Sequence, residues 1–190
     1  MKKVQEPIGG YCGFVALTPD DSLHRRYHDF FYGFPVEDDA ELFGRLVLEI
    51  NQAGLSWTTI LNKEANFRRA YFEWDISRIA AFDDHDRARL LNDAGIIRNR
   101  LKIDAAIYNA SVVLSLQAEF GSFYAWLYHH RYLDKAHWVK LFKRNFRFTG
   151  GEIVNEFLMS TGFLPGAHDE RCEVHHRILQ KKPVWARQKP

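Results

Sequence analysis

Residues 38–57 read DDAELFGRLVLEINQAGLSW and carry the clearest helix signals of this chain. Asp38 suits the N-cap of a helix, and Glu41 three residues later completes a capping box. Gly54 stands where helices commonly stop in a left-handed turn. Between these ends, apolar residues recur at helical spacing: Leu42, Phe43, Leu46, Val47, Ile50 and Ala53. The pattern predicts an amphipathic helix over 38–53 that lays its apolar face against a core.

Glu49 interrupts the apolar edge of this helix, because it lies in line with Leu42 and Leu46. A buried carboxylate costs several kcal/mol unless it is paired, hydrogen-bonded or facing a polar cavity. Trp57, just past the turn, offers a flat apolar surface close to that carboxylate. The two side chains predict a pocket for a flat, hydrogen-bonding ligand. The residues alone leave a second interpretation open, in which Glu49 pairs with one of the many arginines and Trp57 is a core residue.

The composition predicts one compact domain, or two tightly packed lobes, of a folded protein. Hydrophobic residues make up 46% of the 190 residues and aromatic residues 15%, which excludes a disordered chain. The net charge of +2 is too small to indicate a class of partner. No apolar run is long enough to span a membrane, and the N-terminus has no apolar signal region. We therefore expect a cytoplasmic protein without membrane contact.

Start and stop signals predict helices along most of the chain, and no alternating apolar run predicts a strand. The expected helices besides 38–53 are a short one carrying Tyr27 and His28, then 56–72, 76–82, one from Asp83 or Asp84 to near Asn92, 123–130, 134–144, 151–162 and a turn around 168–179. In DAGIIRNRLKIDAAIYNA, residues 93–110, Gly95 separates two strongly helical stretches. This predicts a tight helix–turn–helix hairpin whose second helix runs to about Glu119. The fold class is all-α.

A candidate zinc set lies near the two ends of the chain and comprises Cys12, His28, His168 and Cys172. His168 and Cys172 are four residues apart, so on one helical turn they would face the same way. Two thiolates and two imidazoles suit a closed, structural zinc site that ties irregular segments together. The spacing alone fits no standard zinc finger. It leaves open packing thiols with solvent-facing histidines, or His175 and His176 as competing ligands.

Six stretches of the chain resemble the DNA-3-methyladenine glycosylase I family, alkylation-repair enzymes of the helix-hairpin-helix superfamily. In the family's order they are YCGF at 11–14, YHDFFYGFP at 27–35, LFGRLVLEINQAGLSW at 42–57, DAGIIRNRLKIDAAIYNA at 93–110, FRFTG at 146–150 and GFLPGAHDERC at 162–172. The resemblance implies one globular unit, with a helical glycosylase core at 38–162, the hairpin at 93–102, and a zinc-binding lobe formed by 11–35 and 163–180.

The resemblance also implies an activity, namely hydrolysis of the N-glycosidic bond of 3-methyladenine in damaged double-stranded DNA. Such an enzyme is monofunctional, belongs to base excision repair and releases free 3-methyladenine; we expect a monomer. By position, the resemblance implies that a structural Zn²⁺ is bound by Cys12, His28, His168 and Cys172. It also implies that the base pocket is lined by Tyr27, Glu49 and Trp57, with Glu49 as the catalytic group. The hairpin amides at 94–99 would reach a phosphate, with DNA contacts at Gly95, Arg98, Arg100 and Lys102.

The chain departs from the family pattern at a few positions. The family usually has an acid and a Trp at Phe31 and Tyr32, a Tyr-Ser pair at Asn155 and Glu156, and often Gly at Leu101; the segment 128–140 is shorter than usual. These departures motivate an alternative, a non-catalytic or specificity-altered paralogue of the same fold that binds DNA or a free base. A third interpretation, a helical protein-interaction module, would show no salt-dependent DNA binding.

Overall fold

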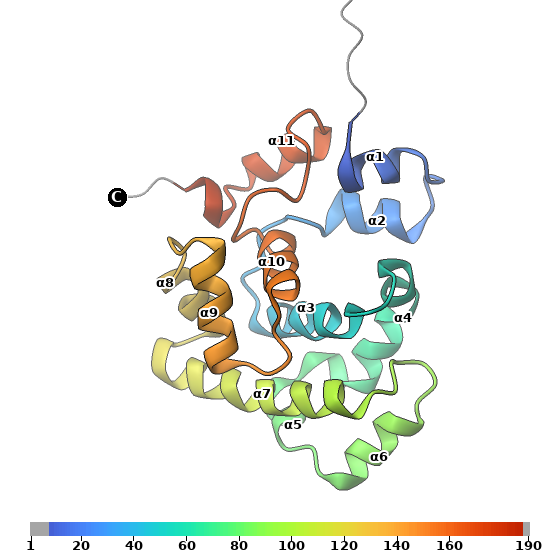
Figure 1. Ribbon diagram of the computed structural model, residues 1–190, viewed down its shortest axis with the longest axis vertical. Coiled ribbons are helices and arrows are strands. Elements are labelled where there is room, and N and C mark those ends of the chain that lie inside the picture. The colour runs from blue at the N-terminus through green and yellow to red at the C-terminus, as the bar shows by residue number, and fades with distance from the viewer. Residues whose placement is uncertain (1–7, 188–190) are drawn as a thin grey trace, which may run out of the picture. The chain divides into compact units, whose positions relative to one another are not determined.

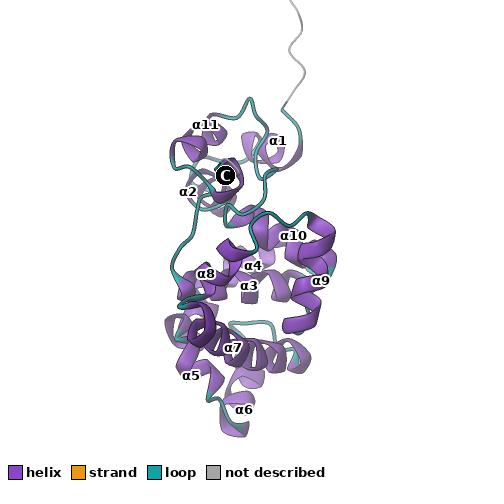
Figure 2. Ribbon diagram, turned by 90° about the vertical axis from the view of Figure 1, so that its left-hand side faces the viewer, coloured by secondary structure: helices purple, strands orange, loops and turns teal. Residues whose placement is uncertain are grey.

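The structure is a computed structural model that describes residues 8–187, and its regular elements are all helices (Figure 1). Figure 2, coloured by secondary structure, shows no strand in that range. The helices are α1 (Gly10–Ala16), α2 (Leu23–Phe30), α3 (Asp39–Gln52), α4 (Trp57–Ala70), η1 (Phe72–Trp74), α5 (Ile76–Ala80), α6 (Asp84–Asn92), α7 (Arg100–Phe120), α8 (Phe123–His129), α9 (Lys135–Asn145), α10 (Gly151–Ser160), α11 (Glu173–Gln180) and η2 (Val184–Ala186). The all-α prediction is confirmed. No helix among the described residues is long and apolar enough to cross a membrane.

The contacts within the chain divide it into two compact units. One unit combines the residues up to Pro35 with those from Met159 onward, so it joins segments that are far apart in the sequence. It holds α1, α2 and α11. The other unit, Val36–Leu158, holds α3 to α9 and most of α10.

Side-chain caps set the starts of the helices in the unit Val36–Leu158. Asp38 Oδ1 accepts a hydrogen bond from the amide of Glu41 at 2.8 Å, as the capping box predicts. Ser56 Oγ accepts one from the amide of Thr59 at 3.2 Å, and Asp83 caps α6 in the same way. The predicted starts of α3, α4 and α6 are thereby confirmed, because an N-cap acts within three residues and the sequence displays it directly.

The end of α4 differs from the prediction. We expected the helix to run to about residue 72, but it stops at Ala70. The next turn, η1, has left-handed backbone angles at Phe72 (φ 49°), Glu73 (φ 55°) and Trp74 (φ 64°). Trp74 is buried against α3, where a Cβ on Gly44 would lie 2.6 Å from its indole nitrogen. Tertiary packing of this indole therefore accompanies a backbone conformation that local propensity disfavours.

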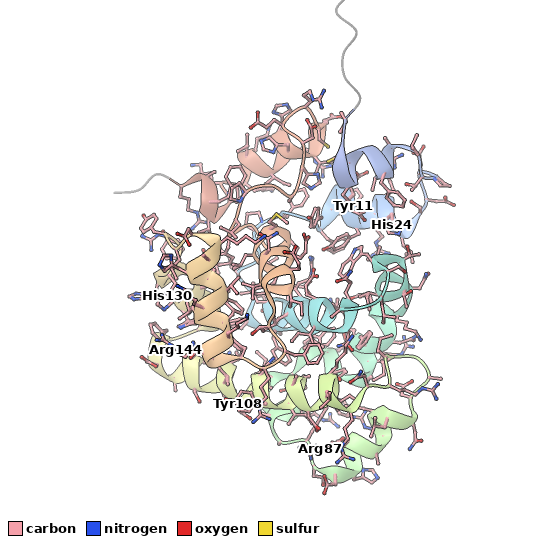
Figure 3. All side chains as sticks on the ribbon, viewed as in Figure 1. Tyr11, His24, Arg87, Tyr108, His130 and Arg144 are labelled. Atoms are coloured by element: carbon pink, nitrogen blue, oxygen red, sulfur yellow. The ribbon has the colours of Figure 1, made fainter. Side chains whose placement is uncertain are left out.

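In the other unit, α1 was not predicted from the sequence. Its polar, glycine-rich start shows no helical apolar spacing, yet Cys12 and Val15 are buried. Tyr11 holds α1 to α2, since its hydroxyl lies 3.0 Å from His24 Nδ1 (Figure 3). Ser22 caps α2, which carries both Tyr27 and His28, as expected for the short helix.

Candidate functional site

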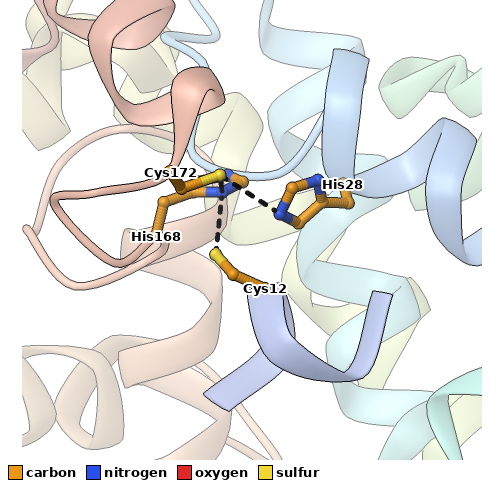
Figure 4. Close-up of side chains that lie close together, drawn as sticks. All are labelled: Cys12, His28, His168 and Cys172. Carbon is orange, nitrogen blue, oxygen red and sulfur yellow. Dashed lines mark hydrogen bonds between the residues drawn. The ribbon is translucent and has the colours of Figure 1, made fainter. Parts of the chain in front are cut away.

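A buried cluster of two cysteines and two histidines lies within the unit formed by the two ends of the chain (Figure 4). It comprises the four predicted ligands Cys12, His28, His168 and Cys172, whose donor atoms all lie within 4.8 Å of one another. Cys12 Sγ is 3.5 Å from His168 Nδ1, and Cys172 Sγ is 3.8 Å from His28 Nε2. Tetrahedral zinc, with bonds of about 2.0–2.3 Å, separates its ligand atoms by roughly 3.3–3.8 Å. The cluster therefore fits a metal ion of this kind.

Both histidines are oriented by a second hydrogen bond. His28 Nδ1 donates to Asp29 Oδ1 at 2.6 Å, so Nε2 faces the cysteines. His168 Nε2 donates to the carbonyl oxygen of Tyr32 at 2.8 Å, so Nδ1 faces them. Burial lowers the pKa of His168 to about 4, which keeps its imidazole neutral, as a metal ligand must be. A carboxylate or carbonyl behind a ligating histidine is the usual arrangement around a bound metal.

By spacing, two other histidines compete as ligands, and the geometry favours neither. His175 packs against Trp185, with ring centroids 6.0 Å apart. Within the described part of the chain, the cluster includes neither His175 nor His176. Asp29 was missed as a supporting residue, although its place directly after His28 in the YHD motif was a usable signal.

Glu49 lies on α3 with only 4% of its surface exposed. Burial and, to a smaller extent, the charge of Glu156 raise the pKa of this carboxyl to about 8, and Arg45 acts in the opposite direction. Among residues 8–187, no hydrogen bond or ion pair reaches the Glu49 carboxyl. Arg45, one turn earlier on α3, instead donates to Glu41 Oε1 at 2.8 Å. The geometry thus gives no support to an ion-paired, structural Glu49.

A tight turn leads from α3 to Trp57. The amide of Leu55 donates to the carbonyl of Gln52 at 2.7 Å. Ala53 has φ −50° and ψ 115°, and Gly54 has φ 81°, which is the backbone of a type II turn and requires glycine at its third position. Trp57 is then the first residue of α4 and is half-buried. The turn thereby fixes the chain between the buried Glu49 and the aromatic side chain predicted to join it.

Tyr27, the third residue predicted for the base pocket, belongs to the unit formed by the chain ends. It is buried on α2, and its ring lies 5.6 Å from that of Tyr32.

The predicted hairpin is a short turn between α6 and α7. The amide of Gly95 donates to Asp93 Oδ1 at 2.7 Å, and a Cβ at Gly95 would lie 2.9 Å from the same oxygen. Lys63 Nζ, from α4, donates to the carbonyl of Ala94 at 2.8 Å. The turn is therefore held from within and from a neighbouring helix, and a side chain at Gly95 would require the Asp93 carboxylate to shift.

The two arginines predicted to contact DNA are exposed beside this turn. Arg98 lies in the turn, and Arg100 is the first residue of α7. Arg100 Nε is 3.8 Å from Asp104 Oδ2, while Asp104 Oδ1 accepts a 3.0 Å hydrogen bond from Arg87. Asp104 thus takes part in a local ion-pair network. Both arginines are placed where a phosphate could reach them.

Lys102 differs from the other predicted DNA contacts, because it is buried with 5% of its surface exposed. Its ammonium donates to the carbonyl oxygens of Asn51 at 2.9 Å and Ala53 at 2.7 Å. Burial lowers the pKa of this lysine. An ammonium turned inward onto α3 does not fit a direct phosphate contact, so that expectation needs correcting. Nothing in the sequence predicts the inward orientation, since a lysine in the first turn of a helix is usually solvated.

Comparison of the sequence and structure with known proteins identifies the family of this chain. The model of the methyladenine glycosylase family matches residues 17–140. DNA-3-methyladenine glycosylase 1 of Escherichia coli strain K12 is 34% identical over 172 residues, which cover 80% of this chain and 90% of that protein. DNA-3-methyladenine glycosylase of Haemophilus influenzae is 30% identical over 172 residues, covering 80% of this chain and 91% of that protein. A solved structure of 3-methyladenine DNA glycosylase I from Staphylococcus aureus, concerned with recognition of 3-methyladenine, has a TM-score of 0.78 at 28% identity and covers 87% of this chain and 97% of that one. The chain belongs to the methyladenine glycosylase family.

Proposed function

We propose that the protein is a DNA repair glycosylase that hydrolyses the N-glycosidic bond of 3-methyladenine in alkylated DNA. The observation that carries this proposal is the Glu49 carboxyl, which is buried and has no partner among the described residues. A buried polar group in that condition needs a ligand that supplies hydrogen bonds or charge. The names of the two relatives and of the solved structure support this choice of base.

Such an enzyme needs to lower the barrier to bond cleavage only moderately. Methylation at N3 leaves adenine in DNA positively charged, which weakens its glycosidic bond. Hydrolysis adds water at the sugar carbon and releases the free base. A damaged base also costs less to flip out of the duplex than a normal one. The enzyme therefore needs recognition more than strong acid catalysis. We assign no lysine nucleophile, so the product is an intact strand with an abasic site, as in a monofunctional enzyme of base excision repair.

Glu49 is the group proposed to recognise the charge of the base. A cationic ring beside the carboxyl favours its ionised form and offsets the cost of burying it. Neutral bases supply no such compensation, so the pocket would select the alkylated one. Trp57 would add stacking on the ring, worth about 1–3 kcal/mol per base. Tyr27 remains a proposed polar contact, which rests on the family resemblance.

DNA binding is proposed at the turn between α6 and α7. Its backbone amides and the exposed Arg98 and Arg100 suit contacts to a few phosphates, as in a helix-hairpin-helix motif. Gly95 serves there because it leaves room for the side chains of Asp93 and Asn66 that lie against it. A monomeric state and a cytoplasmic location stay predictions.

A structural zinc ion is proposed at the cluster of Cys12, His28, His168 and Cys172. Support comes from the donor set, the spacing of its atoms and the second hydrogen bond behind each histidine. Four protein ligands leave no open position for chemistry, so the ion would supply stability. It would tie together the two ends of the chain that form this unit.

The decisive experiment is chromatography of the bases released from methylated DNA by purified protein. We expect free 3-methyladenine, abasic sites without strand cleavage, and little release by a folded Glu49→Gln protein. Salt-dependent DNA binding without any base release would identify a non-catalytic paralogue instead. Release of a different alkylated base would identify an enzyme of altered specificity.

A further inference from the structure

Lys102 is a buried lysine that the proposed chemistry does not use. In the part of the chain that the structure describes, no carboxylate pairs with its ammonium. Lysines are almost never fully buried unless they are paired. Here the partners are two backbone carbonyls, Asn51 O and Ala53 O, at 2.9 and 2.7 Å. The C-terminal end of a helix carries partial negative charge, so the end of α3 suits this cation.

The two carbonyls belong to the segment that precedes Trp57. Asn51 is held further by its own side chain, whose Nδ2 donates to Val47 O at 2.8 Å. Ala53 is the second residue of the type II turn, and its carbonyl is fixed by Lys102. Three residues after Ala53, Ser56 caps α4, and Trp57 begins it. The Lys102 ammonium therefore fixes the backbone between the carboxyl and the aromatic ring of the proposed base pocket.

The other end of Lys102 belongs to the hairpin. Its backbone amide donates to Asn99 Oδ1 at 3.2 Å, and Asn99 is the N-cap of α7. Arg98, the proposed phosphate contact, directly precedes that cap. The Lys102 ammonium also lies 5.8 Å from the ring centroid of Phe148, which is partly exposed. One side chain thus spans from the hairpin turn to the turn that ends α3, across the start of α7.

We propose that Lys102 is a positioning residue for base excision, which holds the turn at 52–55 in a fixed position relative to the hairpin. Contacts between the hairpin and phosphates then place the flipped base against Glu49 and Trp57. This inference rests on the proposed function. It assigns Lys102 no contact with DNA, base or water. A displacement of about 1 Å in a reacting group can cost on the order of 100-fold in rate, so loss of this link should be visible in catalysis.

The test compares Lys102→Met, which keeps most of the apolar stem and removes the ammonium, with Lys102→Arg, which keeps the charge. Lys140→Met is the matched control, because it removes one exposed lysine from α9. For each folded protein we would measure three quantities: the single-turnover rate of base release at saturating protein, the affinity for undamaged duplex over a range of salt, and the affinity for free 3-methyladenine.

We expect Lys102→Met to lower the saturated rate by about 10- to 100-fold and to weaken binding of free 3-methyladenine. Its affinity for undamaged duplex and its salt dependence should match those of the wild type. Lys102→Arg should restore a large part of the rate, and Lys140→Met should behave as the wild type. In an NMR spectrum without DNA, the indole N–H signal of Trp57, assigned with Trp57→Phe, should shift in Lys102→Met.

Two results would overturn the inference. A wild-type rate in a folded Lys102→Met protein would make Lys102 a stabilising residue only. A weaker duplex affinity with a salt slope reduced by about one would make it a phosphate contact. Failure of the proposed function is distinguishable from both, because the wild type itself would then release no 3-methyladenine, while the Trp57 signal would still report whether Lys102 fixes the turn.

Discussion

Glu156 of α10 lies near enough to Glu49 of α3 for its negative charge to raise the pKa of that carboxyl. Burial is the larger cause, Arg45 opposes both, and the resulting pKa is about 8. The family that this chain resembles usually has Ser where Glu156 stands. The Glu49 carboxyl of this protein is therefore mostly protonated at neutral pH before a base binds, although the ionised form complements a cationic base.

The first prediction concerns the pH dependence of excision. Because the proposed recognition of a cationic base needs the ionised Glu49, the rate at subsaturating DNA should rise with pH up to about 8. Glu156→Ser removes a charge that raises the Glu49 pKa, so the rising limb of the pH–rate profile should move to lower pH. Each unit of this shift should raise the rate below the limb about tenfold. Glu152→Ser, an exposed position on the same helix, should leave the limb in place. Identical limbs for Glu156→Ser and the wild type would contradict the electrostatic coupling.

The second prediction concerns stability at different pH values. The Glu49 carboxyl has a pKa of about 8 in the folded chain, against an ordinary glutamate pKa of 4.5. Between these values the folded state holds a proton that the unfolded state has lost, so this group makes stability fall as pH rises, by at most about 1.4 kcal/mol per pH unit. Glu49→Gln should abolish that fall and be more stable than the wild type near pH 8. Denaturant unfolding at several pH values checks this, and parallel curves for both proteins would refute it.

The third prediction concerns Asp29, the residue behind the proposed metal ligand His28. Asp29→Asn weakens the acceptor that orients His28, so affinity for zinc should drop by about 10- to 100-fold. Competition with a chelator measures this affinity, and elemental analysis should find about one zinc per wild-type chain. Asp21→Asn, an exposed change in the same unit, is the control. Equal zinc affinity in all three proteins would show that Asp29 does not support the site.

The fourth prediction concerns the hairpin. Arg98→Ala should weaken binding to any duplex and lower the slope of log affinity against log salt by about 0.9. Arg98→Lys retains the charge and should retain most of the slope. Equilibrium titration of undamaged duplex at several salt concentrations separates the two variants. An unchanged slope in Arg98→Ala would place the DNA-binding face elsewhere on the protein.

Much of the fold could be predicted because its signals are local. Asp38, Ser56 and Asp83 each cap a helix within three residues of their own position, so each cap can be recognised from a few consecutive residues of the sequence. Glu49 could be singled out for a similar reason, because it is a charged residue on the apolar edge of a predicted helix. The cysteine and histidine set was assigned with the help of the family resemblance, because its spacing is not that of a known finger.

Apart from Asp29, which directly follows His28, the features that sequence reasoning missed depend on packing between distant segments. Whether Lys102 points to water or inward depends on the end of α3 lying beside the start of α7. The influence of Glu156 on Glu49 depends on where α10 runs, and α10 begins at Gly151, far along the chain from the end of α3 at Gln52. The left-handed turn ending at Trp74 has no local signal, since none of its residues is glycine or asparagine.

The last prediction tests that turn through the helix it packs on. A Cβ at Gly44 would lie 2.6–2.7 Å from three atoms of the Trp74 indole, which is 1% exposed and cannot move into solvent. Gly44→Ala should therefore destabilise the protein by about 1–3 kcal/mol, although alanine is the better helix former. Gly151→Ala is the matched control on α10, because its nearest neighbour, Val139 Cγ2, would be at 3.9 Å and helix propensity alone should then act, stabilising by up to about 1 kcal/mol. Thermal and denaturant unfolding of both variants give the comparison. If Gly44→Ala were as stable as Gly151→Ala, the indole could be displaced without cost, and the close packing of Trp74 on α3 would not be what maintains the left-handed turn.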